Sequence, residues 1–181
     1  MRIKRFRLLS VAVIAIVLAL AVSVSGVLAQ HKPARAGTAG TFIITGNVQH
    51  KLRLNVATLA SLPNQQSVTV TYRAGGTPEE HTFTGPLLVD VLAKAGPKFD
   101  PAIKNDKLRH FVSVTASVAY RALVAYGEID PSFENKKVLL AVTQDGVSLA
   151  DQGPRLVVPG DGAGGRYVTG VVKVNLNKPV H

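Results

Sequence analysis

A glycine-rich segment near the C-terminal end of the chain, residues 153–168, constrains the fold more than any other stretch. It reads GPRLVVPGDGAGGRYV, and a further strand-like stretch follows it as far as Leu176. Pro159 fixes its own φ angle and has no N–H donor, so a first strand has to end there. The pattern predicts a short strand, a bend of about six residues and a second strand, which most simply form a long hairpin.

The bend also allows an interpretation as a ligand-binding loop. Glycines permit positive φ angles and a close backbone approach, and they recur at Gly160, Gly162, Gly164 and Gly165. Backbone N–H groups exposed in such a loop can face an anion. The segment lacks the Gly-Lys-Ser/Thr ending of a P-loop, and no helical pattern follows it. A nucleotide site is therefore not expected.

The N-terminal segment predicts export. Basic residues precede an almost uninterrupted apolar run from residue 8 to 29, and small residues suited to cleavage lie before Gln30. Residues 1–29 are therefore expected to be a secretory signal peptide. Because the run is also long enough to span a bilayer, an uncleaved N-terminal membrane anchor is the alternative. Either way the remainder is expected to be periplasmic, extracellular or anchored on the outer side of the cytoplasmic membrane.

The rest of the chain suits one domain. Residues 30–40 (QHKPARAGTAG) are expected to be a linker, and residues 41–177 the domain itself. Four of the 21 Lys and Arg residues lie in residues 1–29, which leaves 17 against 11 acidic residues, a net charge of +6 (17 − 11). These basic residues are scattered and aromatic residues are sparse, so nucleic-acid binding is not expected.

The chain contains no cysteine. Stability in an exported domain must then come from burial rather than disulfides. The same absence excludes thiol catalysis, cysteine-held iron–sulfur clusters and cysteine-based zinc sites.

Strand patterns dominate the domain. Alternating or apolar runs predict strands at residues 42–45, 51–54, 67–72, 81–84, 110–115, 121–125 and 138–142, and Asp145-Gly146 predicts a tight hairpin turn. Helical spacing predicts a helix at 56–62 and a clearer one that opens at Gly85-Pro86 and stops at Gly96. The fold class expected is α+β, mostly β, with mixed sheets and two or three short helices.

Residues suited to catalysis are few. No two histidines have metal-ligand spacing, and no serine lies in a nucleophile-elbow pattern. Asp161 can orient a ligand hydroxyl or make a local turn bond. Arg121 and Arg166 each lie near the end of a loop, where together they can bind one anion or point to solvent instead.

Four segments in order carry a resemblance to a known family. They are residues 84–92 (TGPLLVDVL) with Ala95-Gly96, residues 120–122 (YRA), residues 138–141 (VLLA) with Asp145-Gly146, and residues 153–160 (GPRLVVPG). Their order and spacing resemble the molybdopterin-binding domain of the sulfite oxidase superfamily. The resemblance covers about residues 41–177 and implies the sulfite oxidase-type α+β fold, with a pterin cofactor among loops that include the glycine-rich one.

The sequence departs from this family where the metal would bind. The resemblance implies a molybdenum-ligating cysteine near the strand end at residues 69–73 (TVTYR), where Tyr72 or a neighbour stands instead. A phenolate is a hard oxygen ligand with a pKa near 10 and does not replace a soft thiolate. Val118-Ala119 stands where the family often has Asp-Gly, and Thr169 where a basic residue is common. Molybdopterin is thus implied by the resemblance, while the missing cysteine argues against molybdenum.

Three functional hypotheses follow from these observations. The first is an exported, non-redox module that binds a small anionic or pterin-like ligand, or a protein partner. The second is an active molybdopterin-dependent oxidoreductase with an atypical metal ligand, and the third is a structural envelope protein. No catalytic residue or metal ligand is assigned. The cofactor-binding candidates are Tyr72, Tyr120, Arg121, Gly160, Asp161, Gly162, Gly165 and Arg166.

Overall fold

A computed structural model describes residues 40–178 of the chain. The expected signal peptide or anchor, and all but the last residue of the expected linker, lie outside the described residues. None of the helices in residues 40–178 is long and apolar enough to cross a membrane. The described residues are mostly β, with three short α-helices and two 3₁₀ turns among the strands.

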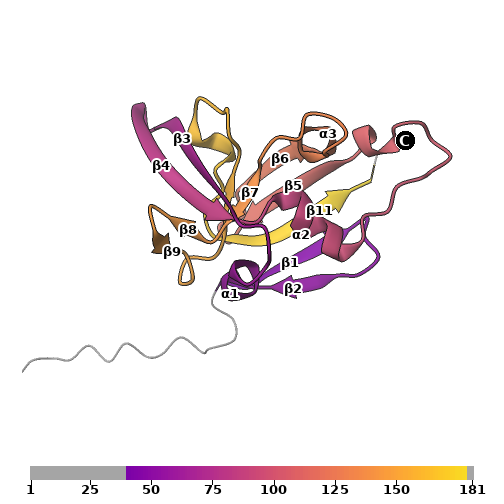
Figure 1. The fold of residues 1–181 in the computed structure, drawn as a ribbon, viewed down its shortest axis with the longest axis horizontal. Helices are drawn as coiled ribbons and strands as arrows, with labels where there is room; N and C mark the ends of the chain where they lie inside the picture. The colour runs from indigo at the N-terminus through magenta and orange to yellow at the C-terminus, as the bar shows by residue number, and fades with distance from the viewer. Residues whose placement is uncertain (1–39, 179–181) are drawn as a thin grey trace, which may run out of the picture. The chain divides into compact units, whose positions relative to one another are not determined.

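A five-stranded sheet forms one layer, in the order β2-β1-β11-β5-β6. The first and last strands of the described chain, β1 (Phe42–Gly46) and β11 (Val171–Asn177), lie side by side and run parallel. The other neighbours are antiparallel, and they are β2 (Leu52–Leu54), β5 (Phe111–Ala116) and β6 (Arg121–Ala125). The parallel pair lies inside the sheet, with β2 and β6 at its edges (Figure 1).

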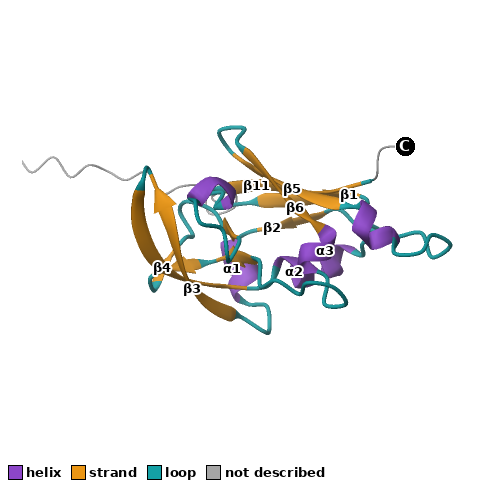
Figure 2. Ribbon diagram, turned by 90° about the horizontal axis from the view of Figure 1, so that it is seen from above, coloured by secondary structure: helices purple, strands orange, loops and turns teal. Residues whose placement is uncertain are grey.

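The larger of two hydrophobic cores covers one face of this sheet. Alternate strand residues point into it, such as Phe42 and Ile44 of β1, because successive side chains of a strand face opposite sides. The helices α1 (Val56–Ala60), α2 (Leu88–Ala95) and α3 (Tyr126–Ile129) supply the facing side chains. Figure 2 shows α2 and α3 on one side of the sheet.

Helix α2 begins later than its sequence predicts. The apolar spacing is confirmed, since Leu88, Val91, Leu92 and Ala95 are all fully buried, and Gly96 ends the helix at a φ of 67°. The expected first residue, Pro86, lies outside the helix because its carbonyl oxygen accepts a hydrogen bond from Leu140. The chain therefore still pairs with a neighbouring strand where the sequence places the first turn.

A second, four-stranded sheet has the order β3-β4-β8-β9. The long strands β3 (Gln66–Ala74) and β4 (Thr77–Gly85) form a hairpin in register over their full length. The short strands β8 (Thr143–Gln144) and β9 (Val147–Ser148) meet at the expected Asp145-Gly146 turn. Both turn residues have positive φ angles, 50° and 79°, as a type I′ turn requires.

A two-stranded ladder stands between the two cores. It pairs β7 (Leu139–Ala141) with β10 (Arg155–Val157) in antiparallel register. Leu140 and Leu156 point into the larger core, whereas their neighbours point into the smaller one, so every residue of β7 is buried. The smaller core contains Val70, Tyr72, Phe83, Leu139, Ala141, Leu149, Val157 and Tyr167.

The prediction of a hairpin around the glycine-rich segment is wrong in its pairing. Strand β10 pairs with β7, while β11 begins only at Val171 and joins the other sheet. The segment is therefore a crossover between sheets, with a 3₁₀ turn η2 (Gly164–Arg166) inside it. Two backbone hydrogen bonds, from Leu156 to Val168 and from Val171 to Pro154, still hold its arms together.

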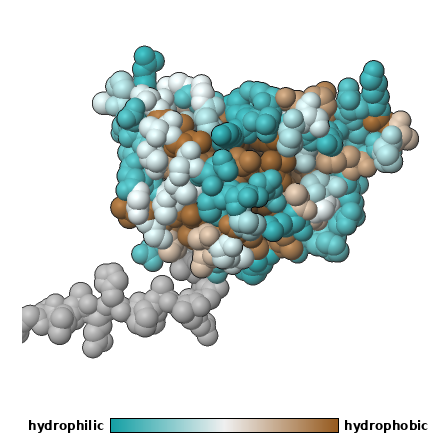
Figure 3. Space-filling model, viewed as in Figure 1, coloured by the Kyte–Doolittle hydropathy of each residue, from teal (hydrophilic) through white to brown (hydrophobic). Residues whose placement is uncertain are grey.

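The loop after α2 contains a further 3₁₀ turn, η1 (Asp106–Arg109). His110 follows it and is buried. The surface of the described residues seen in Figure 3 is mostly hydrophilic or neutral, with hydrophobic atoms visible between the polar groups near the centre.

Candidate functional site

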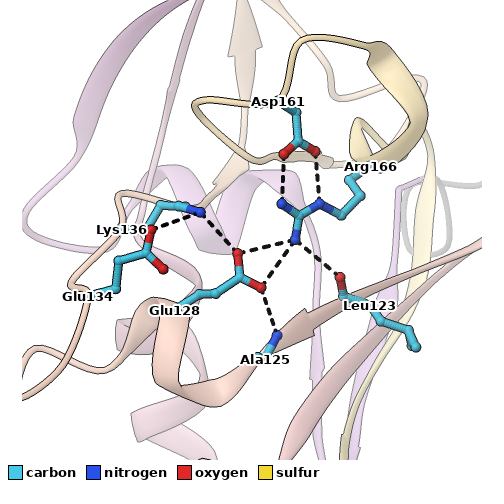
Figure 4. Close-up of polar contacts among 7 residues, drawn as sticks. All are labelled: Leu123, Ala125, Glu128, Glu134, Lys136, Asp161 and Arg166. Carbon is cyan, nitrogen blue, oxygen red and sulfur yellow. Dashed lines mark hydrogen bonds and ion pairs between the residues drawn. The ribbon is translucent and has the colours of Figure 1, made fainter.

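Arg166 is the centre of the polar contacts that fix the glycine-rich loop (Figure 4). Its Nε and Nη2 atoms donate to the two carboxylate oxygens of Asp161 at 2.8 and 2.6 Å. Its Nη1 atom lies 3.2 Å from each carboxylate oxygen of Glu128, in α3, and 3.5 Å from the Leu123 carbonyl oxygen in β6. One guanidinium thus ties the loop to both elements, and Asp161 is an ion-pair partner rather than a local turn former.

Glu128 is shared between two cations. It accepts hydrogen bonds from the Ala125 backbone N–H at 3.0 Å and from Lys136 Nζ at 3.1 Å, besides those from Arg166. Burial is the largest influence on the pKa of Glu128 and opposes ionisation, but the Ala125 and Lys136 bonds and the Arg166 charge outweigh it and lower the pKa. The pKa of Arg166 is raised, mainly by its bond to Asp161. Two carboxylates therefore already neutralise Arg166.

Backbone conformation and close packing require glycine at different positions of the loop. Gly160 has a φ of 92°, in the region that favours glycine, whereas Gly162 and Gly165 do not have positive φ angles. Gly164 lies so close to Tyr72 that a Cβ atom there would be 3.2 Å from the aromatic ring. Packing against Tyr72, rather than approach to an anion, thus accounts for Gly164.

Hydrogen bonds from Tyr120 and from the end of β3 hold the loop. The hydroxyl of Tyr120, which is 51% exposed, donates to the Gly165 carbonyl oxygen at 2.5 Å. The backbone N–H of Arg73 donates to the Gly162 carbonyl oxygen at 3.1 Å. Tyr72, the neighbour of Arg73, is buried and stacks on Tyr167 with ring centroids 4.2 Å apart. The loop is therefore a fixed wall over an aromatic cluster.

Arg155 lies beside this aromatic cluster with no acidic partner. Its Nη1 atom donates to Gln144 Oε1 at 2.8 Å and its Nη2 atom to the Tyr72 hydroxyl at 3.2 Å, and its guanidinium lies 5.3 Å from the centre of the Phe83 ring. Within residues 40–178 Arg155 makes no ion pair, and its buried Nε atom has no hydrogen-bond partner. A half-buried cation with only neutral neighbours is costly unless an anion joins it.

Tyr167 supplies a second unpaired donor in the same cluster. The residue is 5% exposed, and its buried hydroxyl has no hydrogen-bond partner within the described part of the chain. Burial, with smaller contributions from Asp161 and Tyr72, raises the pKa of Tyr167 to about 12, although Arg155 acts in the opposite direction. The hydroxyl therefore stays protonated at neutral pH and is able to donate a hydrogen bond.

The structure brings together most of the residues predicted from the sequence. Asp161 and Arg166 form an ion pair, Tyr120 bonds to Gly165, and Tyr72 packs against the loop. Arg121 stands apart from them, exposed on the outer side of β6. Of the two alternatives for these arginines, Arg121 points to solvent, whereas Arg166 forms ion pairs within the protein.

Sequence reasoning missed Arg155 and Tyr167. Arg155 is the one charged residue in an apolar strand that Pro159 ends. That isolation was the signal available. Tyr167 follows Arg166 directly, and nothing in the sequence distinguishes its hydroxyl from that of an ordinary core tyrosine.

The residues around the loop do not fit a molybdenum site. The chain has no cysteine, and residues 40–178 contain no group of three or more His, Asp or Glu side chains that could hold a metal ion. Tyr72, which stands near the expected metal ligand, accepts a hydrogen bond from Arg155 and stacks on Tyr167. A hard, hydrogen-bonded phenol does not replace a thiolate.

Comparison with known proteins supports the fold. No protein-family model and no curated protein sequence matches the chain. Among solved structures, it is similar to the crystal structure of the sulfane dehydrogenase SoxCD from Paracoccus pantotrophus, with a TM-score of 0.60 and 19% identity. The match covers 76% of this chain but 38% of the SoxCD chain. At this identity the likeness concerns the fold alone.

His81 joins the β3–β4 hairpin to the β8–β9 turn. Because it pairs with carboxylates, its contribution to stability is expected to depend on pH. Its Nδ1 atom lies 2.7 Å from Asp145 Oδ2, and its Nε2 atom lies 3.3 Å from Glu79 Oε2. The Asp145 bond is the largest cause that raises the pKa of His81 above its ordinary value near 6.5. A raised pKa stabilises the fold fully below about pH 6.5, and this stability is lost as pH rises through the folded-state pKa.

We therefore expect His81→Gln to reduce the urea midpoint more at pH 5.5 than at pH 8.5. The matched control is His50→Gln, because His50 is exposed and makes no ion pair within residues 40–178. Its effect should be the same at both pH values. An effect of His81→Gln that grows toward pH 8.5 would contradict the assignment.

Proposed function

We propose that the protein is an exported, non-redox module that binds a small anion at Arg155 on a scaffold like that of the sulfite oxidase superfamily. The observation that carries the proposal is the pair of unpaired donors, Arg155 Nε and the Tyr167 hydroxyl, in one aromatic cluster. Export is inferred from the basic and apolar residues 1–29. The non-redox role is inferred from the missing thiolate.

The contrast with Arg166 supports the choice of Arg155. Arg166 has two carboxylate partners, so an incoming anion there would meet Asp161 and Glu128 first. The guanidinium of Arg155 contacts a neutral amide oxygen, a phenol and the Phe83 ring, and no carboxylate within residues 40–178 pairs with it. A guanidinium matches the geometry of phosphate, sulfate and carboxylate groups, which accept paired N–H donors.

The remaining candidates then have supporting roles in the proposal. Tyr72 holds one arm of Arg155, and the wall that runs from Gly160 to Gly165 covers the cluster. Asp161, Arg166 and Tyr120 keep that wall in place. A pterin-like ligand would bind through its acidic group rather than through a metal.

The Nε–H signal of Arg155 provides a direct test of anion binding. The protein is purified in the form that its host cell produces. Titration with sodium sulfate or phosphate should shift this ¹⁵N NMR signal, whereas sodium chloride at matched ionic strength should not. Arg155→Gln should abolish saturable binding. Arg121→Gln is the matched control, because Arg121 is exposed on β6, and it should leave the affinity within about twofold.

Tyr167→Phe separates binding from structure. It removes a buried hydroxyl that has no hydrogen-bond partner within residues 40–178, so the free energy of unfolding should not fall, and anion affinity should weaken by about fivefold to tenfold. Loss of stability with unchanged affinity would contradict the proposal.

Metal analysis of the natively purified protein tests the main alternative, since stoichiometric molybdenum would favour an oxidoreductase with an atypical metal ligand. Absence of both metal and anion binding would favour a structural envelope protein.

A further inference from the structure

A second site lies at the other end of β5 from Tyr120 and the glycine-rich loop. A cavity of about 560 Å³ opens between the end of β1, the turn η1 and the loop that joins α2 to η1. This volume is within the range of small-molecule sites. Its lining includes three polar side chains that are at least nine-tenths buried, Asn47, Asp106 and His110.

The hydrogen bonds of these polar residues fix their orientation. Asn47 Nδ2 donates to the Lys98 carbonyl oxygen, which identifies this atom as the amide nitrogen. The same nitrogen lies 3.1 Å from His110 Nε2, so Nε2 must be the acceptor. The proton of a neutral His110 then lies on Nδ1, which donates to the Asp106 carbonyl oxygen at 2.9 Å. The floor of the cavity is therefore rigid and has a defined pattern of donors and acceptors.

One acceptor of this floor is left for a ligand. Both amide hydrogens of Asn47 are used, but its Oδ1 atom accepts no hydrogen bond from any residue within the described part of the chain. Asp106, in contrast, is fully engaged, because it accepts from the Asp100 backbone N–H at 2.9 Å and from Arg109 Nη1 at 3.3 Å. A ligand that reaches the floor should thus offer a hydrogen-bond donor to Asn47.

The rim of the cavity is positively charged. Lys98, Arg109 and Lys178 lie around it against two carboxylates, Asp100 and Asp106, a formal balance of +1 (3 − 2) with His110 neutral. Lys98 and Lys178 make no ion pair within residues 40–178, whereas Arg109 pairs with Asp106. The two lysines are therefore the cations available to an acidic group.

Two apolar side chains, Phe99 and Ile103, also line the cavity. Phe99 packs edge-on against His110 with ring centroids 5.0 Å apart, and Ile103, which is 38% exposed, lines the cavity beside it. We propose that this cavity binds a flat organic carboxylate that also carries a hydrogen-bond donor. The carboxylate would contact Lys98 and Lys178, the flat body would lie against Phe99 and Ile103, and the donor would reach Asn47 Oδ1.

The proposal is tested with 4-hydroxybenzoate, which has a carboxylate, a flat ring and a donor. Backbone amide NMR signals of Lys98, Phe99, Ile103 and Arg109 should shift, with a Kd of about 0.1–1 mM. Benzoate, which lacks the donor, should bind about fivefold more weakly. The uncharged 4-hydroxybenzyl alcohol should bind at least about tenfold more weakly, because it lacks the group that contacts the lysines.

Exposed lysines allow variants that leave the buried floor intact. Lys98→Ala combined with Lys178→Ala should weaken 4-hydroxybenzoate at least about tenfold, whereas Lys104→Ala, in the same loop but outside the cavity lining, should change Kd less than about twofold. Absence of shifts at these amides at 10 mM probe would overturn the proposal. Equal affinity of the double variant, or of all three probes, would overturn it too. Because Arg155 lies in a different site, sulfate binding there is a separate measurement, so either proposal can fail alone.

Discussion

Replacing Gly46 with alanine should prevent the domain from folding stably. Gly46 ends β1 with a φ of 96°, and an added Cβ atom would lie 2.1 Å from the Leu176 carbonyl oxygen of β11. That oxygen also accepts the backbone N–H of Asn47 at 2.7 Å, so it has little freedom to move. We expect a loss of more than about 4 kcal/mol in the free energy of unfolding, comparable with the whole stability of many domains. Urea unfolding of the soluble fraction measures it.

Gly76→Ala is the matched control for backbone strain. Gly76 has nearly the same φ, 95°, but open space around the position of an added Cβ atom. It should cost about 1–2 kcal/mol, the penalty for an alanine in a left-handed conformation. A similar loss for both variants would show that strain alone matters and that the parallel pairing of β1 with β11 tolerates the extra carbon.

Arg166→Gln should be the second most damaging single change. It leaves Asp161 and Glu128, whose side chains are 19% and 20% exposed, without the cation between them. Breaking a partly buried ion pair by removing one partner is strongly destabilising, and we expect a loss of about 2–3 kcal/mol. Thermal and urea unfolding at pH 7 measure it. Faster hydrogen exchange of the Gly160–Gly165 backbone amides would report the released loop.

A double-mutant cycle with Asp161→Asn isolates the central pair. The contacts of 2.8 and 2.6 Å form a two-bond arrangement between Arg166 and Asp161, for which a coupling energy of at least about 1 kcal/mol is expected. Arg121→Gln serves as the control and should change stability by less than about 0.5 kcal/mol. Strictly additive effects in the cycle would mean that the loop is held by Tyr120 and Arg73 instead.

Local sequence patterns predicted the elements of the fold well but not how they pair. The strand at 121–125 has the predicted bounds, and the Asp145-Gly146 turn has the predicted geometry, because alternation and turn chemistry are local properties. The partner of β10 is not local. The side chains of β7 and β10 pack into both hydrophobic cores. A strand that is buried on both faces is apolar throughout, so its sequence shows no alternation from which its partner could be predicted.

The sequence shows which residues carry charge, but only the fold shows which charges are already paired. Arg166 has two carboxylate partners, whereas Arg155 has none within residues 40–178. Glu128 is distant from Arg166 along the chain, so its approach depends on the packing of α3 beside the loop. No single-sequence pattern contains that information.

The β7–β10 ladder between the two cores limits how this domain can evolve. Because β7 and β10 contribute side chains to both cores, neither half has a hydrophobic face that it could keep if the other were removed. The domain therefore cannot be divided, shortened or shuffled as two modules. Arg155 is the half-buried first residue of β10 in that ladder, and the two residues after it are buried. Substitutions that create new ligand contacts are therefore easier to accommodate in the surface loops than in β7 and β10.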